Sequence, residues 1–320
     1  MKKILITGAA GFIGFNLCKL LISKNYMVYG IDNFDNYYSI SLKKKRIKIL
    51  KENKNFFFKK IDITNKKNLI DFFKNKNFNF VIHLAAQAGV RYSLLNPQKY
   101  IDVNIFGFLN IIDLSKKNNV KKFIYASSSS VYGESKKFPL KENQQLNPKN
   151  IYGLTKKLNE QIAKIYYDQF NLRSIGLRFF TIYGEWGRPD MFLLKLFNAS
   201  FNKKKFYLNN YGKHKRDFTY ISDATNAVYE LINKNNIKHD VINICSNKPI
   251  NILDIINYFK KNNYINFKLV GIHKADVKDT HGSNLKLKKI IKKFKISNFY
   301  ECFDKTYKWY FKNNIHKLKK

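Results

Sequence analysis

The sequence predicts an α/β protein built on a doubly wound parallel sheet, with a smaller α/β lobe partly interleaved with it. Short apolar runs alternate with amphipathic stretches through the first half of the chain. Strands separated by helices of that length form βαβ units, whose right-handed crossovers cover both faces of a parallel sheet. After about residue 180 the alternation loosens, and Gly and aromatic residues cluster instead. A chain of 320 residues can bury a core in one large domain or two unequal ones.

Apolar runs with the length and side-chain types of buried strands give the expected order of elements. They are Lys3–Thr7, Met27–Ile31, Phe56–Ile61, Phe80–Leu84, Phe123–Ser127, Ser174–Phe179 and Asp240–Ile244. Helical periodicity is clear in Phe12–Ser23, and we expect further helices at Pro97–Asn118 and Ile151–Phe170. These elements place a first domain at 1–180, with a strand returning near 217–247, and a second domain at 181–320. The lysine-rich end, Ile315–Lys320, is expected to be solvated.

Charge and cysteine content limit the class of protein. A formal net charge of +38 can indicate a nucleic-acid binder, but lysine is spread along the whole chain with abundant Asn, Ile, Phe and Tyr. That composition is typical of an A- and T-rich genome, and no recognition motif accompanies it, so we expect no nucleic-acid partner. Three cysteines without a CxxC pair indicate a reduced, cytoplasmic protein with no metal site. No apolar stretch approaches the roughly 18–20 residues of a membrane span.

A glycine-rich turn follows the first predicted strand. Gly8, Gly11 and Gly14 allow a tight turn, a close approach of backbone to a pyrophosphate, and close helix–strand packing. The phosphates of a dinucleotide would then lie at the positive end of the helix dipole. Asp32 ends the next strand, where a carboxylate accepts hydrogen bonds from the adenosine ribose and repels a 2′-phosphate. The pattern therefore predicts a Rossmann-type NAD site in preference to three ordinary turn glycines and a surface aspartate.

Later strand ends reach the same edge of the predicted sheet. Asp62–Ile63 would flank the adenine, and Leu84–Gln87 supplies small residues where backbone must approach the dinucleotide. Taken alone, either segment also fits ordinary packing. The residues predicted to bind the cofactor are Gly8, Gly11, Phe12, Ile13, Gly14, Asp32, Asn33, Asp62, Ile63, Leu84, Ala85, Ala86 and Gln87, together with Tyr152 and Lys156.

A tyrosine and a lysine stand one helical turn apart at Tyr152 and Lys156. Helical periodicity continues after them, so their side chains are expected on one face. A lysine in that position would lower the tyrosine pKa and make the phenol a usable base near neutral pH. The YxxxK pattern arises by chance in a chain rich in both residues, and its weight comes from the glycine turn and from the hydroxyl-bearing strand end Ser127–Ser130 upstream.

The glycine turn, the serine-rich strand end and YxxxK together resemble the extended short-chain dehydrogenase/reductase superfamily, in its NAD-dependent epimerase/dehydratase family. The resemblance runs from Met1 to about Thr280 and narrows to the UDP-glucuronate 4-epimerase type. It narrows on four stretches: GIDNFDNYYSISLKKKR (30–46), HLAAQAGVRYSLLNP (83–97), RFFTIYGEWGRPDM (178–191) and YGKHKRDFTYISD (211–223).

The resemblance implies a cytoplasmic enzyme that interconverts UDP-glucuronate and UDP-galacturonate for surface polysaccharide, through a transient 4-keto intermediate and a recycled NAD. It also implies a homodimer joined through the helices Pro97–Asn118 and Ile151–Phe170. A neutral UDP-hexose 4-epimerase is the rival enzyme. A non-catalytic NAD-binding regulator is the rival of another class, and the intact set Ser128, Tyr152 and Lys156 counts against it.

The resemblance also implies roles within the serine run. Ser128 matches the catalytic hydroxyl that bridges Tyr152 and the sugar oxygen, and Ser127 is expected to contact backbone or cofactor. The next two positions hold Asp-Glu in related 4,6-dehydratases, and the second is Glu in decarboxylases. Here they are Ser129 and Ser130, a neutral pair that can donate hydrogen bonds to a substrate carboxylate. Thr181 matches a residue that joins this cluster, where neutral-hexose epimerases typically carry Asn.

Arginine is scarce in this lysine-dominated chain, yet Arg188 and Arg216 fall inside matched stretches, at positions that grip the nucleotide diphosphate or its neighbourhood. A structural role and a substrate-binding role fit Arg91 equally well. The segment His273–Val277 departs from the family pattern of Arg or Gln before Pro-Gly-Asp-Val, which leaves open the nucleotide contacts usually made there.

Overall fold

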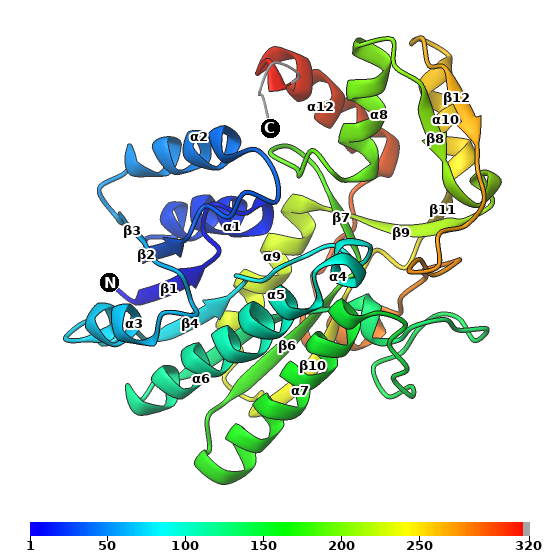
Figure 1. Ribbon diagram of the computed structural model, residues 1–320. Coiled ribbons are helices and arrows are strands. Elements are labelled where there is room, and N and C mark those ends of the chain that lie inside the picture. The colour runs from blue at the N-terminus through cyan, green and yellow to red at the C-terminus, as the bar shows by residue number, and fades with distance from the viewer. Residues whose placement is uncertain (316–320) are drawn as a thin grey trace.

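The computed structural model describes residues 1–315, and its centre is a sheet of seven parallel strands (Figure 1). In spatial order the strands are β10 (His239–Ile244), β6 (Ser174–Phe179), β5 (Lys122–Ser128), β4 (Phe80–His83), β1 (Lys3–Thr7), β2 (Met27–Asp32) and β3 (Phe56–Lys60). Each predicted strand is present with ends shifted by at most a residue, and the doubly wound α/β fold is confirmed. The chain reverses direction across the sheet between β1 and β4, which is where such sheets bind ligands.

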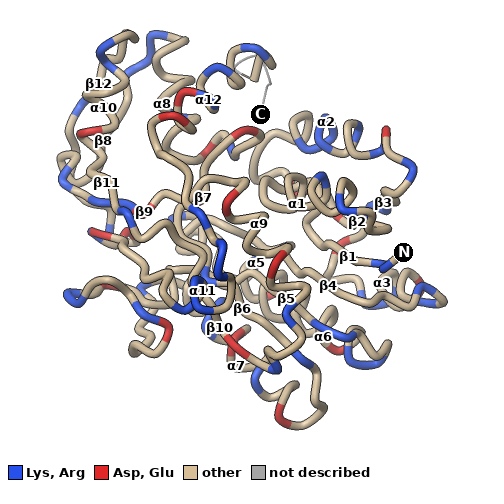
Figure 2. Tube along the Cα trace, turned by 180° about the vertical axis from the view of Figure 1, so that it is seen from behind, with Lys and Arg blue, Asp and Glu red and all other residues tan. Residues whose placement is uncertain are grey.

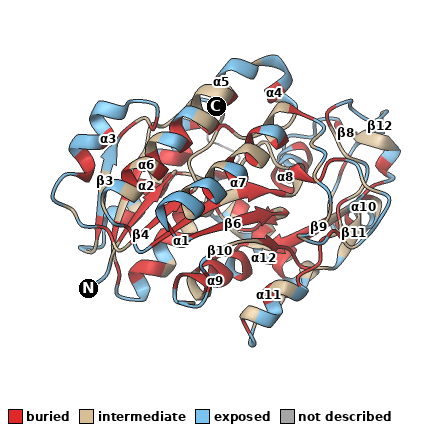
Figure 3. Cartoon of the chain, turned by 90° about the horizontal axis from the view of Figure 1, so that it is seen from below, coloured by how far each residue is buried: buried red, intermediate tan, exposed pale blue. Residues whose placement is uncertain are grey.

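The two faces of the sheet carry separate cores, because successive strand residues point to opposite sides. In β1, Ile4 and Ile6 pack into one apolar cluster, and Leu5 packs into the other. The first cluster is covered by α1 (Phe12–Ser23), α2 (Ile40–Lys51) and α9 (Ile221–Ile232), and the second by α3 (Lys66–Phe73), α6 (Phe108–Lys117) and α7 (Ile151–Phe170). Figure 3 shows the buried strands enclosed between helices whose outer faces are exposed.

The predicted helix Pro97–Asn118 is present, and it contains a π-helical turn. It comprises α5 (Pro97–Ile101), a π-helical turn (Asp102–Gly107) and α6. Within the turn, Asn104 exchanges two hydrogen bonds with the backbone of Gln87 and donates a third to the Thr155 hydroxyl. The irregular turn therefore ties the loop after β4 to α7, and π-helical turns are frequent at functional sites.

Beyond β6 the chain builds a second lobe, at the upper right of Figure 1, and returns to the large sheet for α9 and β10. The lobe contains two small sheets, β11-β9-β7 and β12-β8. Its strands are β7 (Thr181–Tyr183), β8 (Phe206–Leu208), β9 (Lys215–Tyr220), β11 (Pro249–Asn251) and β12 (Phe267–Leu269), and its helices are α8 (Phe192–Phe201), α10 (Ile252–Lys260) and α12 (Phe299–Lys312). The remaining short helices are α4 (Tyr92–Leu95) and α11 (Leu285–Ile290).

The expectation that the C-terminal end, Ile315–Lys320, is exposed to solvent is wrong for its first residue. Ile315 is buried against the first core cluster, although lysines follow it in the sequence. The rest of that segment, 316–320, lies outside the described residues. Figure 2 shows Lys and Arg distributed over nearly every element of the trace. Within residues 1–315, no helix combines the length and the apolar character needed to cross a membrane.

A methyl group at Gly14 tests the close packing of α1 on the first turn. An added Cβ would lie 2.1 Å from the Gly8 carbonyl oxygen, so backbone must move. We expect Gly14→Ala to destabilise the protein by about 1–3 kcal/mol, the range for overpacking a core, and to weaken nucleotide binding. Thermal unfolding measures the first effect. Gly271→Ala is the matched control, because a Cβ there meets nothing within 4 Å; equal unfolding temperatures for the two variants would contradict the packing argument.

Candidate active site

A cavity of about 1140 Å³ opens at the carboxyl ends of the parallel strands, between the sheet and the second lobe. It is lined by every predicted site residue except Asp62. The carboxylate of Asp62 instead accepts hydrogen bonds from Asn33 Nδ2 (2.8 Å) and from the backbone and hydroxyl of Thr64. Asp62 thus holds Asn33, which does line the cavity, and its contact with the adenine stays a prediction.

The glycine turn forms a cradle of backbone at one end of the cavity. Gly8 has φ +72°, and a Cβ there would meet the backbone nitrogen of Ala85 at 2.8 Å. Gly11 closes the turn by donating its N–H to the Gly8 carbonyl (2.9 Å), immediately before α1 begins. Backbone N–H groups at a helix N-terminus attract phosphate, so the cradle fits a dinucleotide pyrophosphate.

Asp32 stands at the end of β2, and both of its carboxylate oxygens accept backbone hydrogen bonds, from Ala10 and Phe34. Burial raises the pKa of this carboxyl, and the ammonium of Lys43 opposes the rise. Lys43 also lines the cavity, and burial lowers its own pKa. The residue predicted to bind the adenosine ribose is therefore an aspartate that backbone N–H groups orient, with a nearby lysine, missed by sequence reasoning, as its partner in charge.

Tyr152 and Lys156 lie on the first turns of α7, which begins under the side-chain cap of Asn150. Lys156 is 2% exposed and donates a hydrogen bond to the Ala126 carbonyl at 2.8 Å, with its Nζ 6.0 Å from the Tyr152 ring centroid. Burial lowers the pKa of this lysine to about 7. The two side chains thus share one face of the helix, as expected, and both line the cavity.

Burial also raises the pKa of Tyr152, and two groups oppose the rise: a hydrogen bond with Ser128 and the positive charge of Arg188. Sequence reasoning attributed this lowering effect to Lys156. The difference has a physical reason, because a desolvated ammonium whose own pKa is about 7 is a weakened cation. The serine and the arginine therefore contribute to the acidity of the phenol in addition to binding.

Of the four consecutive serines, Ser127 and Ser128 end β5, and Ser129 and Ser130 begin the turn that follows. Ser128 closes the strand, and its Oγ accepts a hydrogen bond from the Ser130 backbone N–H and donates to the Ser130 hydroxyl. Ser129 and Thr181 are half-buried cavity residues whose hydroxyls have no hydrogen-bond partner within the described residues. Ser127 also lines the cavity, and its hydroxyl donates to the buried carboxylate of Glu160, at 2.6 Å. The structure adds this side-chain contact, and the expected contact of Ser127 with the cofactor stays a prediction.

The predicted arginines are all held by protein groups. Arg188 makes a bidentate ion pair with Asp190 and lies over the Tyr37 ring, 5.4 Å from its centroid. Arg216 donates hydrogen bonds to the backbone carbonyls of Val277 and Lys278, which brings it against the divergent segment. These contacts leave both guanidinium groups at the cavity wall, oriented by the protein.

Arg91 pairs with Asp276, with 2.7 Å between its Nη2 and the carboxylate. Lys149 and Asn150 donate hydrogen bonds to the carbonyls of Asp276 and Ala275. The divergent segment is therefore a strap across one side of the cavity, pinned to both halves of the protein. Within that strap, His273 Nδ1 accepts a hydrogen bond from Ala275 and serves a local turn. No cluster of three His, Cys, Asp or Glu able to hold a metal occurs in residues 1–315.

The family model described as "NAD dependent epimerase/dehydratase family" matches residues 4–245. The chain belongs to this family. The UDP-glucuronate 4-epimerase of Thermodesulfobacterium geofontis is a 37% identical relative, aligned over 100% of this chain and 99% of its own. Protein CapI of Staphylococcus aureus is 42% identical over 79% of this chain and 81% of its own.

Among solved structures, the UDP-glucuronic acid 4-epimerase of Bacillus cereus in complex with UDP-glucuronic acid and NAD superposes with a TM-score of 0.91. It is 32% identical and the match covers 97% of this chain and 99% of that one. Family membership makes NAD the cofactor, and the residues present fit it. The glycine cradle suits the pyrophosphate, Asp32 the adenosine ribose, and Tyr152 and Lys156 the nicotinamide end of the cavity.

Arg46 is a buried residue of this family member that sequence reasoning missed. It is 0% exposed, and within the described residues no carboxylate pairs with it. Its guanidinium donates to the carbonyls of Ala10, in the glycine turn, and of Trp186 and Gly187, in the loop that carries Arg188. A sequence signal existed, since Leu42, Arg46 and Leu50 recur at the spacing of one helix face. Arg46 thus joins the cofactor loop to the substrate side of the cavity.

Replacing the buried lysine should separate stability from activity. We expect Lys156→Met to abolish turnover yet stabilise nucleotide-stripped protein, because it removes a desolvated charge. The folded pKa of about 7 lies below the ordinary 10.5, so the unfolded chain binds the extra proton between these values, and stability of the wild type rises with pH there. The gain in unfolding temperature should be largest at pH 7 and shrink toward pH 10. A variant destabilised at every pH would contradict this.

Proposed function

We propose that this protein is an NAD-dependent 4-epimerase that interconverts UDP-glucuronate and UDP-galacturonate. The observation that carries the proposal is the set of neutral hydroxyls, from Ser129, Ser130 and Thr181, that lines the same cavity as Tyr152 and Arg188. Full-length relatives and a closely superposing structure that carry the name of this activity support it.

The catalytic residues fit a reversible oxidation at the sugar C4. In its deprotonated form Tyr152 is the base that takes the proton of the 4-hydroxyl, and Ser128, which hydrogen-bonds to the phenol, bridges it and that oxygen. Lys156 holds the nicotinamide ribose. NAD supplies the acceptor for the hydride of C4 and gives it back, so the net reaction is redox-neutral. Rotation of the 4-keto sugar before the hydride returns inverts the configuration at C4.

Neutral hydroxyls at Ser129 and Ser130 distinguish this site from those of dehydratases and decarboxylases. They cannot serve as acid and base for the elimination of water, but they can donate hydrogen bonds to the uronate carboxylate, each contributing about 1.5–3 kcal/mol. The 4-keto intermediate of a uronate is a β-keto acid and is prone to lose CO₂. A fixed carboxylate keeps the bond to that group out of alignment with the ketone.

The assembly and cellular setting form part of the same proposal. Exposed apolar side chains lie on the adjacent segment of the π-helical turn, α6 and α7, and include Phe106, Leu109, Leu154, Ile165 and Phe170. Two copies of this face can pack as a homodimer, which agrees with the helices expected from the sequence. The three unpaired cysteines suit a cytoplasmic enzyme, and its uronate product suits the synthesis of surface polysaccharide.

Substrate choice is tested by incubating purified protein with UDP-glucuronate and, separately, with UDP-glucose, without added reductant. We expect the C4 epimer from the uronate alone, because only that sugar supplies a carboxylate for the hydroxyl cluster. Product analysis by nucleotide chromatography distinguishes the outcomes. Epimerisation of UDP-glucose alone would establish the neutral-hexose rival, and no turnover of either sugar with NAD bound would favour the non-catalytic regulator.

The hydroxyl cluster is tested by Thr181→Ala and Ser130→Glu. Loss of one hydrogen bond to a carboxylate should lower kcat/KM for UDP-glucuronate roughly tenfold or more, and the added carboxylate of Ser130→Glu should act more strongly through repulsion. Both variants should form more UDP-pentose than the wild type. Ser23→Ala, at the exposed end of α1, is the control. Unchanged turnover and no increase in UDP-pentose would refute the carboxylate assignment.

A further inference from the structure

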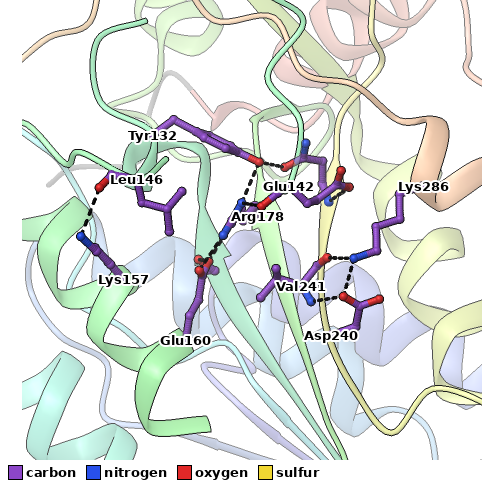
Figure 4. A network of polar contacts seen from close by, with 11 residues as sticks. Tyr132, Glu142, Leu146, Lys157, Glu160, Arg178, Asp240, Val241 and Lys286 are labelled. Atoms are coloured by element: carbon purple, nitrogen blue, oxygen red, sulfur yellow. Dashed lines mark hydrogen bonds and ion pairs between the residues drawn. The ribbon is translucent and has the colours of Figure 1, made fainter. Parts of the chain in front are cut away.

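A deeply buried ion pair, shown in Figure 4, lies outside the cavity and contacts the residues on both sides of the serine turn, Ser129–Val131. The Arg178 guanidinium, on β6, binds the Glu160 carboxylate, on α7, through two parallel hydrogen bonds of 2.8 Å. The side chains are only 3% and 9% exposed. Bidentate pairing of this kind sets the relative orientation of the two groups as well as their distance.

The pair holds both flanks of the turn that carries the reactive hydroxyls. On one side, Glu160 accepts the hydrogen bond of Ser127, the residue before Ser128. On the other side, Arg178 donates to the Tyr132 hydroxyl at 2.9 Å and lies over its ring. Tyr132 follows the turn directly, and its hydroxyl also donates to Asn243 on β10 at 2.7 Å. The Arg178–Glu160 ion pair therefore holds the chain on both sides of the turn, at Ser127 and at Tyr132.

The two members of the ion pair also belong to the two elements that carry the other site residues, α7 and the end of β6. Glu160 stands one helical turn after Lys156 on α7. Arg178 lies near the end of β6, and Thr181 begins β7 directly after it. Neither Glu160 nor Arg178 lines the cavity, so neither can touch a substrate. A buried ion pair is weak evidence for stability, since apolar replacements are often neutral. What this pair provides is a fixed relation between the hydroxyl turn, the catalytic helix and the strand leading to Thr181.

We propose that Ser127, Tyr132, Glu160 and Arg178 form a positioning network that determines whether the 4-keto intermediate is reduced or loses CO₂. The inference rests on the proposed function. In the unwanted route the C5–C6 bond breaks, CO₂ leaves, and the electron pair remains on C5 as the enolate of the 4-ketone. C5 then takes a proton from water and C4 recovers the hydride that it gave up, which yields a UDP-pentose. The network suppresses this route by keeping Ser129 and Ser130 where they hold the carboxylate.

Ser127→Ala and Tyr132→Phe test the network, because each removes one hydroxyl and leaves the ion pair and both of its carboxylate hydrogen bonds in place. With UDP-glucuronate we expect kcat to fall roughly tenfold, KM to change little, and the ratio of UDP-pentose to epimer to rise several-fold. Reduced nicotinamide, followed by its near-ultraviolet absorbance, should accumulate during turnover. A purely structural role would lower the unfolding temperature without moving the product ratio.

Asp240→Asn is the matched control. It breaks the neighbouring ion pair of Asp240 with Lys286, which Figure 4 also shows and which makes no contact with the serine turn. The inference is overturned if Ser127→Ala and Tyr132→Phe match this control in product ratio and in reduced nicotinamide. A wild type that epimerises only UDP-glucose would instead overturn the proposed function. In that case an unchanged amount of reduced nicotinamide in the two variants, measured with UDP-glucose, would also overturn the positioning role.

Discussion

Seven strands that run in one direction place the start of every βα connection at the same edge of the sheet, and the chemistry of this protein depends on that constraint. The glycine turn after β1, Asp32 at the end of β2 and the serine turn after β5 are distant in sequence, yet all three open into one cavity. Tyr152 and Lys156 join them because α7 packs on the sheet beside β5. The core determines this arrangement, since Leu5 and Ala163 belong to one apolar cluster.

Burial then changes the properties of the groups gathered at that edge. Desolvation moves the pKa of Lys156 down to about 7 and the pKa of Tyr152 upward, so neither group behaves as it would in water. The charge of Arg188 and the hydroxyl of Ser128 partly restore the acidity of the phenol. A residue predicted to bind substrate and one predicted to relay the proton thereby also tune the base, so one cavity wall can serve both recognition and catalysis.

The second lobe is joined to the sheet by polar ties as well as by apolar packing. Arg46 links the glycine turn to the loop of Arg188, and the Arg91–Asp276 pair fastens the divergent strap to the loop after β4. The Arg178–Glu160 pair lies within the first domain, where it joins β6 to α7. Arg46, which is buried, and Arg91, which is 44% exposed, thus hold loops of the large sheet and segments of the second lobe in a fixed relation around one cavity.

The sequence by itself determined the order of the strands, the glycine turn, Asp32 and the YxxxK pair, because each of these is a local pattern read over a few residues. Periodicity and turn chemistry act within one element, and burial of the strands made the pattern easy to read. The tertiary structure decided what depends on distant partners. It turned Asp62 toward Asn33, Ser127 toward Glu160 and Arg91 toward Asp276, and it buried Arg46 and Ile315. A side chain's partner is chosen by which other elements pack around it, and packing brings together residues whose separation along the chain carries no signal.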